Sequence, residues 1–85
     1  MNAEQESAVQ TRTIVVSVNG HQVSVPHKIS GEGLKQAAID QGVPIELDFV
    51  LFLKHGHDYE QIADDETIEA HKGEEFRCVA PDDVA

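Results

Sequence analysis

Alternation of apolar and polar residues is clearest between residues 13 and 25. Two alternating segments, Ile14-Val-Val-Ser-Val18 and His21-Gln-Val-Ser-Val25, flank Asn19-Gly20. An Asn-Gly pair in that position predicts a two-residue hairpin turn, because both turn residues need positive φ. The register that follows pairs Val18 with His21, Val16 with Val23 and Ile14 with Val25. We expect the core face of this hairpin to consist of Ile14, Val16, Val23 and Val25.

A helical pattern follows the hairpin. Ser30 is a suitable N-cap, and the residues at helical spacing after it are Leu34, Ala37, Ala38 and Gln41. This stripe predicts a helix that packs on the sheet. Gly42 supplies a left-handed C-terminal position, and Pro44 prevents continuation. Because Gly31 and Gly33 lower helix propensity, we expect the first turn to fray.

The longest apolar run is Phe49-Val-Leu-Phe-Leu53, which predicts a buried strand. A single helix covers only one face of a sheet, so one alternate set of this run is exposed or meets a partner. We expect residues 55–70 to be polar and loop-like, with Tyr59 and Ile62 as anchors and a short edge segment from Ile68. The last strand is predicted at residues 75–80.

The element order is therefore β-β-α-β-β, which indicates an α+β fold with a mixed sheet packed on one helix. We divide the chain into a flexible N-terminal arm (1–11), a globular domain (12–80) and a C-terminal tail (81–85). The arm is polar and lacks periodicity. The predicted core includes Val16, Leu34, Val50 and Phe52.

Charge and composition limit the classes of partner that we expect this chain to bind. The 85 residues carry a formal net charge of −10, which disfavours nucleic acid and anionic membrane surfaces and favours a basic protein partner. The single Cys78 cannot form an internal disulfide, which fits a reducing compartment. No apolar run approaches twenty residues and no signal region is visible. We expect a soluble, cytoplasmic monomer.

The sequence contains few side chains at spacings typical of catalytic or metal-binding sites. His55-Gly-His-Asp58 has metal-binding side chains, but they are too clustered for a closed site without distant partners, so solvated loop histidines are the favoured interpretation. The sequence lacks hydrolase, zincin and phosphate-loop motifs. Cys78 alternates with Phe76 in the last strand and is expected to be a buried thiol. So small a domain also leaves little room for a pocket of about 300 Å³. We expect no enzymatic activity and no cofactor.

The order of elements and several short stretches resemble ubiquitin-like β-grasp proteins, most closely the bacterial multiubiquitin-type domains. The matching stretches are Ile14–Gly20, Ser30–Leu34, Gly42–Pro44, Val50–Leu53, Ile62–Asp65 and Gly73–Arg77. The resemblance implies a prokaryotic ubiquitination-like system. Its usual members are an activating (adenylating) enzyme, a conjugating enzyme and a processing peptidase.

An ungapped comparison with ubiquitin puts Leu51 in the place of its exposed isoleucine, with Val50 and Phe52 inward. Strand alternation then adds neighbours to the same side. The predicted partner-binding patch on the open face of the sheet consists of Phe49, Leu51, Leu53, Arg77 and Val79.

The predicted conjugation tail consists of Pro81, Asp82, Asp83, Val84 and Ala85. We expect it to be disordered and to enter an adenylating active site. Ubiquitin-like modifiers usually end in two glycines, whereas this chain has Val84-Ala85, so trimming by a peptidase or a divergent enzyme is implied. Three functions stay open: a conjugated modifier, a non-conjugated binding module that uses the open face, and a sulfur carrier. Four lysines are open as acceptors of a second copy: Lys28, Lys35, Lys54 and Lys72.

Overall fold

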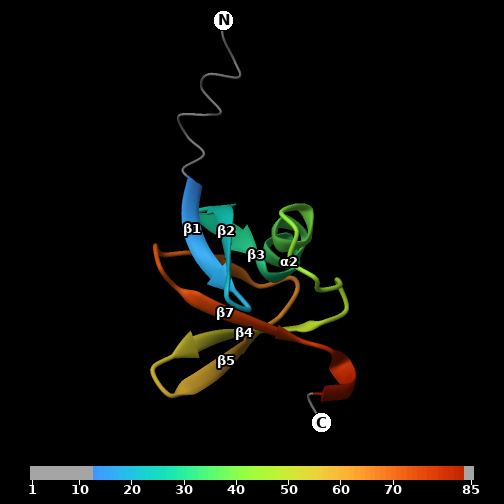
Figure 1. Cartoon of the computed structure of the whole chain (residues 1–85). Coiled ribbons are helices and arrows are strands. Elements are labelled where there is room, and N and C mark those ends of the chain that lie inside the picture. The colour runs from blue at the N-terminus through green and yellow to red at the C-terminus, as the bar shows by residue number, and fades with distance from the viewer. Residues whose placement is uncertain (1–12, 84–85) are drawn as a thin grey trace, which may run out of the picture.

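The computed structural model describes residues 13–83, which form an α+β fold. A five-stranded mixed sheet has the order β2-β1-β7-β4-β5, and a separate two-stranded sheet pairs β3 with β6. The strands are β1 (Thr13–Val18), β2 (His21–Pro26), β3 (Lys28–Ser30), β4 (Val50–His55), β5 (Asp58–Ile62), β6 (Thr67–Glu69) and β7 (Glu75–Val79). The helices are α2 (Gly31–Asp40) and the short 3-10 helix η1 (Pro81–Asp83) (Figure 1).

The hairpin of β1 and β2 confirms the predicted register. Val18 lies opposite His21, Val16 opposite Val23 and Ile14 opposite Val25. Asn19 and Gly20 form the turn with φ of 53° and 85°, the positive values that the Asn-Gly pair tolerates. Val16, Val23 and Val25 are buried, and Ile14 packs against the core from a partly buried position.

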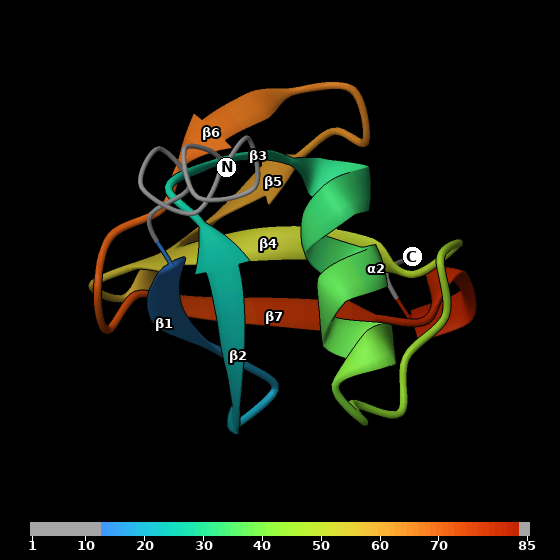
Figure 2. The same cartoon turned by 90° about the horizontal axis from the view of Figure 1, so that it is seen from above.

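Helix α2 lies across β7 and β4, as seen from its own side of the sheet in Figure 2. Ser30 is the N-cap, and its Oγ accepts a hydrogen bond of 3.0 Å from the Gly33 N–H. Leu34 and Ala38 are fully buried and Ala37 partly so, whereas Gln41, which we expected on the buried stripe, is exposed. The helix has ended by then: Gln41 is the C-cap and Gly42 follows with φ of 98°.

The expected fraying of the first helical turn is wrong. Gly31 is buried, and its N–H donates to the Glu66 carbonyl at 3.0 Å. The Glu32 N–H donates to the Asp64 carbonyl at 3.0 Å. A Cβ at position 31 would collide with the Ala63 carbonyl. Glycine is therefore present because the helix end docks closely against the segment before β6, and its low propensity is compensated there.

The face assignment of the apolar run is inverted. Leu51 and Leu53 are buried, whereas Val50 and Phe52 are only partly buried. The physical reason is the pairing of β4 with β7, which places Leu51 opposite Cys78 and Leu53 opposite Phe76. Residues directly opposite in a ladder share one face, and Cys78 and Phe76 belong to the core. A shift of one residue thus moves every side chain to the other face.

Residues 55–70 are more regular than expected, because they contain β5 and β6. Ile62 is a core residue, as predicted. Tyr59 is not an anchor, since it is 49% exposed on the edge strand β5. Ile68 lies in the middle of β6, opposite Ile29 of β3.

Residues at both ends of the chain lie outside the range that the structure describes. The predicted N-terminal arm, residues 1–11, lies outside the described residues, as do Val84 and Ala85. Pro81–Asp83 form η1, so the expected disorder is wrong for these three residues.

Candidate interaction surface

One face of the five-stranded sheet carries no helix. Cross-strand pairs on β4 and β7 define it, because Val50 lies opposite Val79 and Phe52 opposite Arg77. Lys54 lies opposite Tyr59 on the neighbouring strand β5. We call this surface the open face, and its residues are Ser17, Val50, Phe52, Lys54, Tyr59, Gln61, Glu75, Arg77 and Val79.

The structure places only part of the predicted patch on the open face. Arg77 is exposed and Val79 partly buried there, and their role in binding stays a prediction. Leu51, Leu53 and Phe49 are misplaced in the predicted patch. Leu51 and Leu53 lie in the core, and Phe49 precedes β4 and packs against the core. Their places on the open face are taken by Val50, Phe52 and Tyr59, which the sequence reasoning missed.

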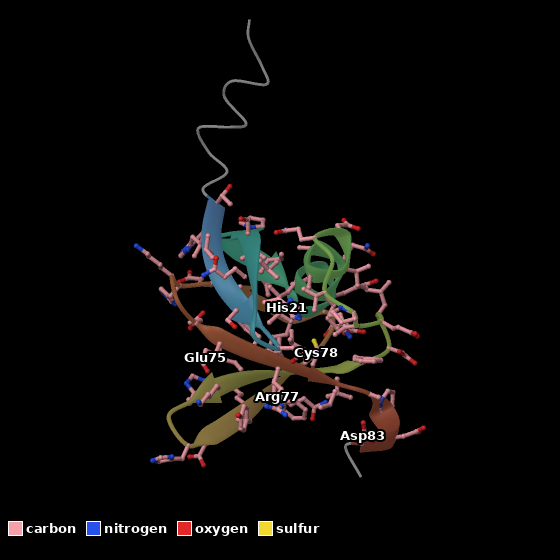
Figure 3. All side chains as sticks on the ribbon, in the orientation of Figure 1. His21, Glu75, Arg77, Cys78 and Asp83 are labelled. Atoms are coloured by element: carbon pink, nitrogen blue, oxygen red, sulfur yellow. The ribbon has the colours of Figure 1, made fainter. Side chains whose placement is uncertain are left out.

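A depression of about 570 Å³ hollows the open face over β7. This volume exceeds the pocket of about 300 Å³ for which we expected little room in so small a domain. The hairpin turn bounds one side and β5 the other. Its lining residues are Ser17, Asn19, Gly20, Lys54, Tyr59, Glu75, Phe76, Arg77, Cys78 and Val79. In Figure 3 the Arg77 side chain extends from the middle of β7 on the side away from α2.

The electrostatics of the depression differ from those of the whole chain. Lys54 Nζ lies 3.4 Å from Glu75 Oε1, so these two charges largely compensate each other. No ion pair or side-chain hydrogen bond found within residues 13–83 involves the Arg77 guanidinium. Among the described residues, Arg77 therefore supplies a positive charge without an ionic partner beside Phe52 and Val79.

Asn19 links the hairpin turn to β7. Its side-chain amide donates from Nδ2 to the Cys78 carbonyl at 2.9 Å and accepts at Oδ1 from the Cys78 N–H at 2.8 Å. The Asn19 backbone N–H donates to the Phe76 carbonyl at 3.0 Å. This side chain replaces a peptide group and extends the short parallel pairing of β1 with β7 by one residue. The sequence predicted the turn but not this second role.

Lys35 is 2% exposed, which is rare for a lysine. Its Nζ donates to the carbonyls of Leu47 and Phe49, each at 2.7 Å, and lies 2.7 Å from Asp64 Oδ1. The ammonium group therefore connects α2 to the loop before β4, which contains Leu47 and Phe49, and to the loop between β5 and β6, which contains Asp64. Since its three hydrogens are used in this way, Lys35 is excluded as an acceptor in the folded domain. Lys28, Lys54 and Lys72 are exposed.

Cys78 is buried, as predicted, and its thiol is far from nucleophilic. Burial raises the pKa of this thiol from 9.0 to about 11, and the charge of Lys35 lowers it by a smaller amount. At neutral pH the thiolate is absent, and the thiolate is the nucleophilic form.

Within residues 13–83, no three side chains of His, Cys, Asp or Glu converge as metal ligands. His55, at the end of β4, instead lies 2.9 Å from Glu60 Oε1 on β5. Neither helix in this part of the chain has the length and apolar character that a membrane-spanning helix requires.

The chain leaves the sheet from its central strand. Val79 and Ala80 are partly buried, and Pro81–Asp83 are exposed beyond the end of β7 (Figure 1). A hydrogen bond of 2.9 Å from the Asp83 N–H to the Ala80 carbonyl closes η1.

Of three comparisons with known proteins, the one with protein-family models gives a match. Searches among curated proteins and among solved structures each found no significant match. The family model described as Multiubiquitin matches residues 14–82, which span the hairpin, the helix and all strands of both sheets. The strand order, the single packed helix and this match together show that the chain belongs to the Multiubiquitin family of ubiquitin-like domains.

Proposed function

We propose that this ubiquitin-like domain is a protein modifier, attached to its targets through the segment that follows β7. In the proposed chemistry, the C-terminal carboxylate attacks the α-phosphorus of ATP, and pyrophosphate leaves. A nucleophile on an enzyme then attacks the acyl carbon of the adenylate, and AMP leaves. Finally an amine or hydroxyl group of the target attacks the acyl carbon of this enzyme adduct, and the enzyme nucleophile leaves with the proton.

The observation that supports this proposal most is the path of the chain after β7. This strand lies between β1 and β4, and its last residues are held by β4, where Val79 lies opposite Val50, and by the Asn19 side chain, which bonds to Cys78. Pro81–Asp83 follow directly and are exposed. If η1 unwinds, an extended segment of five residues spans at most about 17 Å, which is enough to reach into a neighbouring active site.

The partners of this proposal are an activating enzyme, a conjugating enzyme and a processing peptidase. Val84-Ala85 differs from the two glycines that such tails usually carry. A valine side chain hinders passage through a narrow channel, so the proposal includes either trimming by the peptidase or an enzyme with a wider channel.

ATP–pyrophosphate exchange with the activating enzyme of the same organism tests the proposal. Three forms are compared with and without the peptidase: residues 1–85, residues 1–81, and residues 1–85 with a C-terminal amide. We expect exchange from at least one of the two forms that end in a free carboxylate, and none from the untreated amide. If the amide gains activity after peptidase treatment, trimming precedes activation. Equal exchange from all three untreated forms, or none from any form, would exclude the modifier.

A second candidate function is a non-conjugated binding module, which the open face favours. Val50, Phe52 and Val79 are partly buried apolar side chains on that face, with the Arg77 charge beside them. Such a module keeps its binding when residues 81–85 are removed, whereas a modifier loses its activity.

A further inference from the structure

We infer that the open face of one copy binds the acidic segment Pro81–Asp83 of a second copy. This association goes beyond the proposed function, because it involves the purified chain alone and no enzyme.

The binding side is the depression over β7. Arg77 lines it and has no ionic partner within the described residues, while Lys54 of β4 and Tyr59 of β5 line it as well. Phe52, directly opposite Arg77 on β4, and Val79 add apolar surface. A guanidinium beside apolar and aromatic side chains fits a carboxylate carried by a short peptide segment. The volume of about 570 Å³ accommodates a few residues.

The charge distribution selects an acidic ligand at this place. The chain as a whole carries −10, so its surface repels most acidic segments. Among residues 13–83 the exposed basic side chains are Lys28, Lys54, Lys72 and Arg77. Lys54 and Arg77 line the depression together with Glu75, and because Glu75 pairs with Lys54, the Arg77 charge leaves the depression positive among the described residues. An acidic segment that approaches this domain is therefore attracted more by the open face than by the acidic surface as a whole.

The second copy supplies such a segment. Asp82 and Asp83 are adjacent, exposed carboxylates that extend beyond β7. No ion pair found within residues 13–83 joins either carboxylate to Arg77 of the same copy, and Figure 3 shows Asp83 beyond the end of β7. The 3-10 turn of η1 fixes this direction. Contact between the two charges thus requires a neighbouring molecule.

Face and segment are different surfaces, so the contact is heterologous and joins copies head to tail. Exposed ion pairs contribute only about 0.2–1 kcal/mol each and are screened by salt. We therefore expect a monomer at micromolar concentration and association only in roughly the millimolar range.

A charge-swap experiment tests the inference by sedimentation equilibrium and NMR line widths at low salt. One variant carries Arg77→Glu, and a second carries Asp82→Lys with Asp83→Lys. Each variant alone should self-associate about tenfold more weakly than the wild-type chain. An equimolar mixture of the two should associate again, within about threefold of the wild-type constant, because the swapped charges attract each other.

Matched controls separate this contact from net charge. Lys72→Glu changes the net charge by the same amount as Arg77→Glu. Glu46→Lys with Asp65→Lys changes it by the same amount as the double aspartate variant. Both controls should leave the association constant within about threefold of that of the wild type. Thermal unfolding verifies that all variants are folded. The inference is overturned if the wild-type chain stays monomeric at millimolar concentration, if the mixture fails to associate, or if the controls abolish association equally. None of these results bears on pyrophosphate exchange, so the proposed function is tested separately.

Discussion

At the scale of single residues, the decisive feature is which alternate set of β4 faces the helix. Leu51 is 1% exposed and lies opposite Cys78, whereas Phe52 lies opposite the exposed Arg77. Burial, and not size or hydrophobicity alone, therefore determines what each side chain contributes. We therefore expect the larger Phe52 to contribute less to folding than the smaller Leu51.

The first prediction compares Leu51→Ala with Phe52→Ala. We expect Leu51→Ala to cost about 2–5 kcal/mol of unfolding free energy, because it leaves a cavity in the core. Phe52→Ala should cost about 1 kcal/mol or less, since its ring lies partly in solvent. Urea unfolding measures both values. A larger loss for Phe52→Ala would restore the original face assignment and remove the open face described here.

The second prediction concerns Lys35. Lys35→Met should cost about 2–4 kcal/mol, because the carbonyls of Leu47 and Phe49 lose a charged donor in a partly buried site. Asp64→Asn should cost about 1 kcal/mol or less, since the Asp64 side chain is 59% exposed and its ion pair is screened by solvent. Lys72→Met is the matched control on the surface and should be close to neutral. Equal losses for Lys35→Met and Asp64→Asn would show that the ion pair, rather than the carbonyl contacts, dominates.

The third prediction is a pH dependence that arises from Cys78. Its pKa is raised to about 11 by burial, so the folded chain holds this proton after the unfolded chain has lost it. Stability is therefore fully present below pH 9 and falls as the pH rises from 9 to about 11, by roughly 2–3 kcal/mol. Cys78→Ala should lack this part of the decrease. Parallel stability curves for wild type and variant over that range would contradict the burial of the thiol.

At the scale of elements, the hairpin turn does more than reverse the chain. The Asn19 amide makes two hydrogen bonds to the backbone of Cys78, so the turn fixes the strand from which Pro81–Asp83 emerge. β1 and β7 are otherwise paired over only two residue positions. The turn therefore supports the base of the segment on which the proposed function depends.

The fourth prediction separates the two roles of Asn19. Asn19→Gly keeps the positive φ of the turn but leaves the Cys78 N–H and carbonyl without this partner. We expect a loss of about 1–2 kcal/mol and faster hydrogen exchange of the Cys78 amide, while the hairpin amides of β1 and β2 stay protected. Uniform loss of protection across the hairpin would instead mean that the side chain acts only on the turn.

At the scale of the whole molecule, local signals predicted the α+β class, the hairpin register and the helix boundaries. Asn-Gly, Ser30 and Gly42 act on their immediate neighbours, so their effects are readable from sequence. The face of β4 depends on its pairing with β7, about 25 residues away, and an ungapped comparison with ubiquitin misplaced it by one residue. Lys54 was a usable signal, because it shares an alternate set with Val50 and Phe52 and marks that set as solvent-facing.

Other features of the candidate site have no local signal. The double hydrogen bond of Asn19 to Cys78 joins residues 59 apart in sequence. Burial of Lys35 depends on two carbonyls and a carboxylate that come together only in the folded chain. The depression over β7 likewise combines residues of the hairpin, β4, β5 and β7. Sequence patterns report the period of an element, but they do not report which distant elements meet.

The modifier role is the central claim, and the intact mass of the protein isolated from its own cells under denaturing conditions tests it most directly. An N-terminally tagged chain is compared with the same chain ending at Ala80. We expect species heavier than the free chain, with branched peptides that join residues after β7 to a target side chain, and none from the shortened chain. Recovery of only unattached chain, or equal adducts from both forms, would contradict the claim and leave the open face as the basis of a non-covalent function.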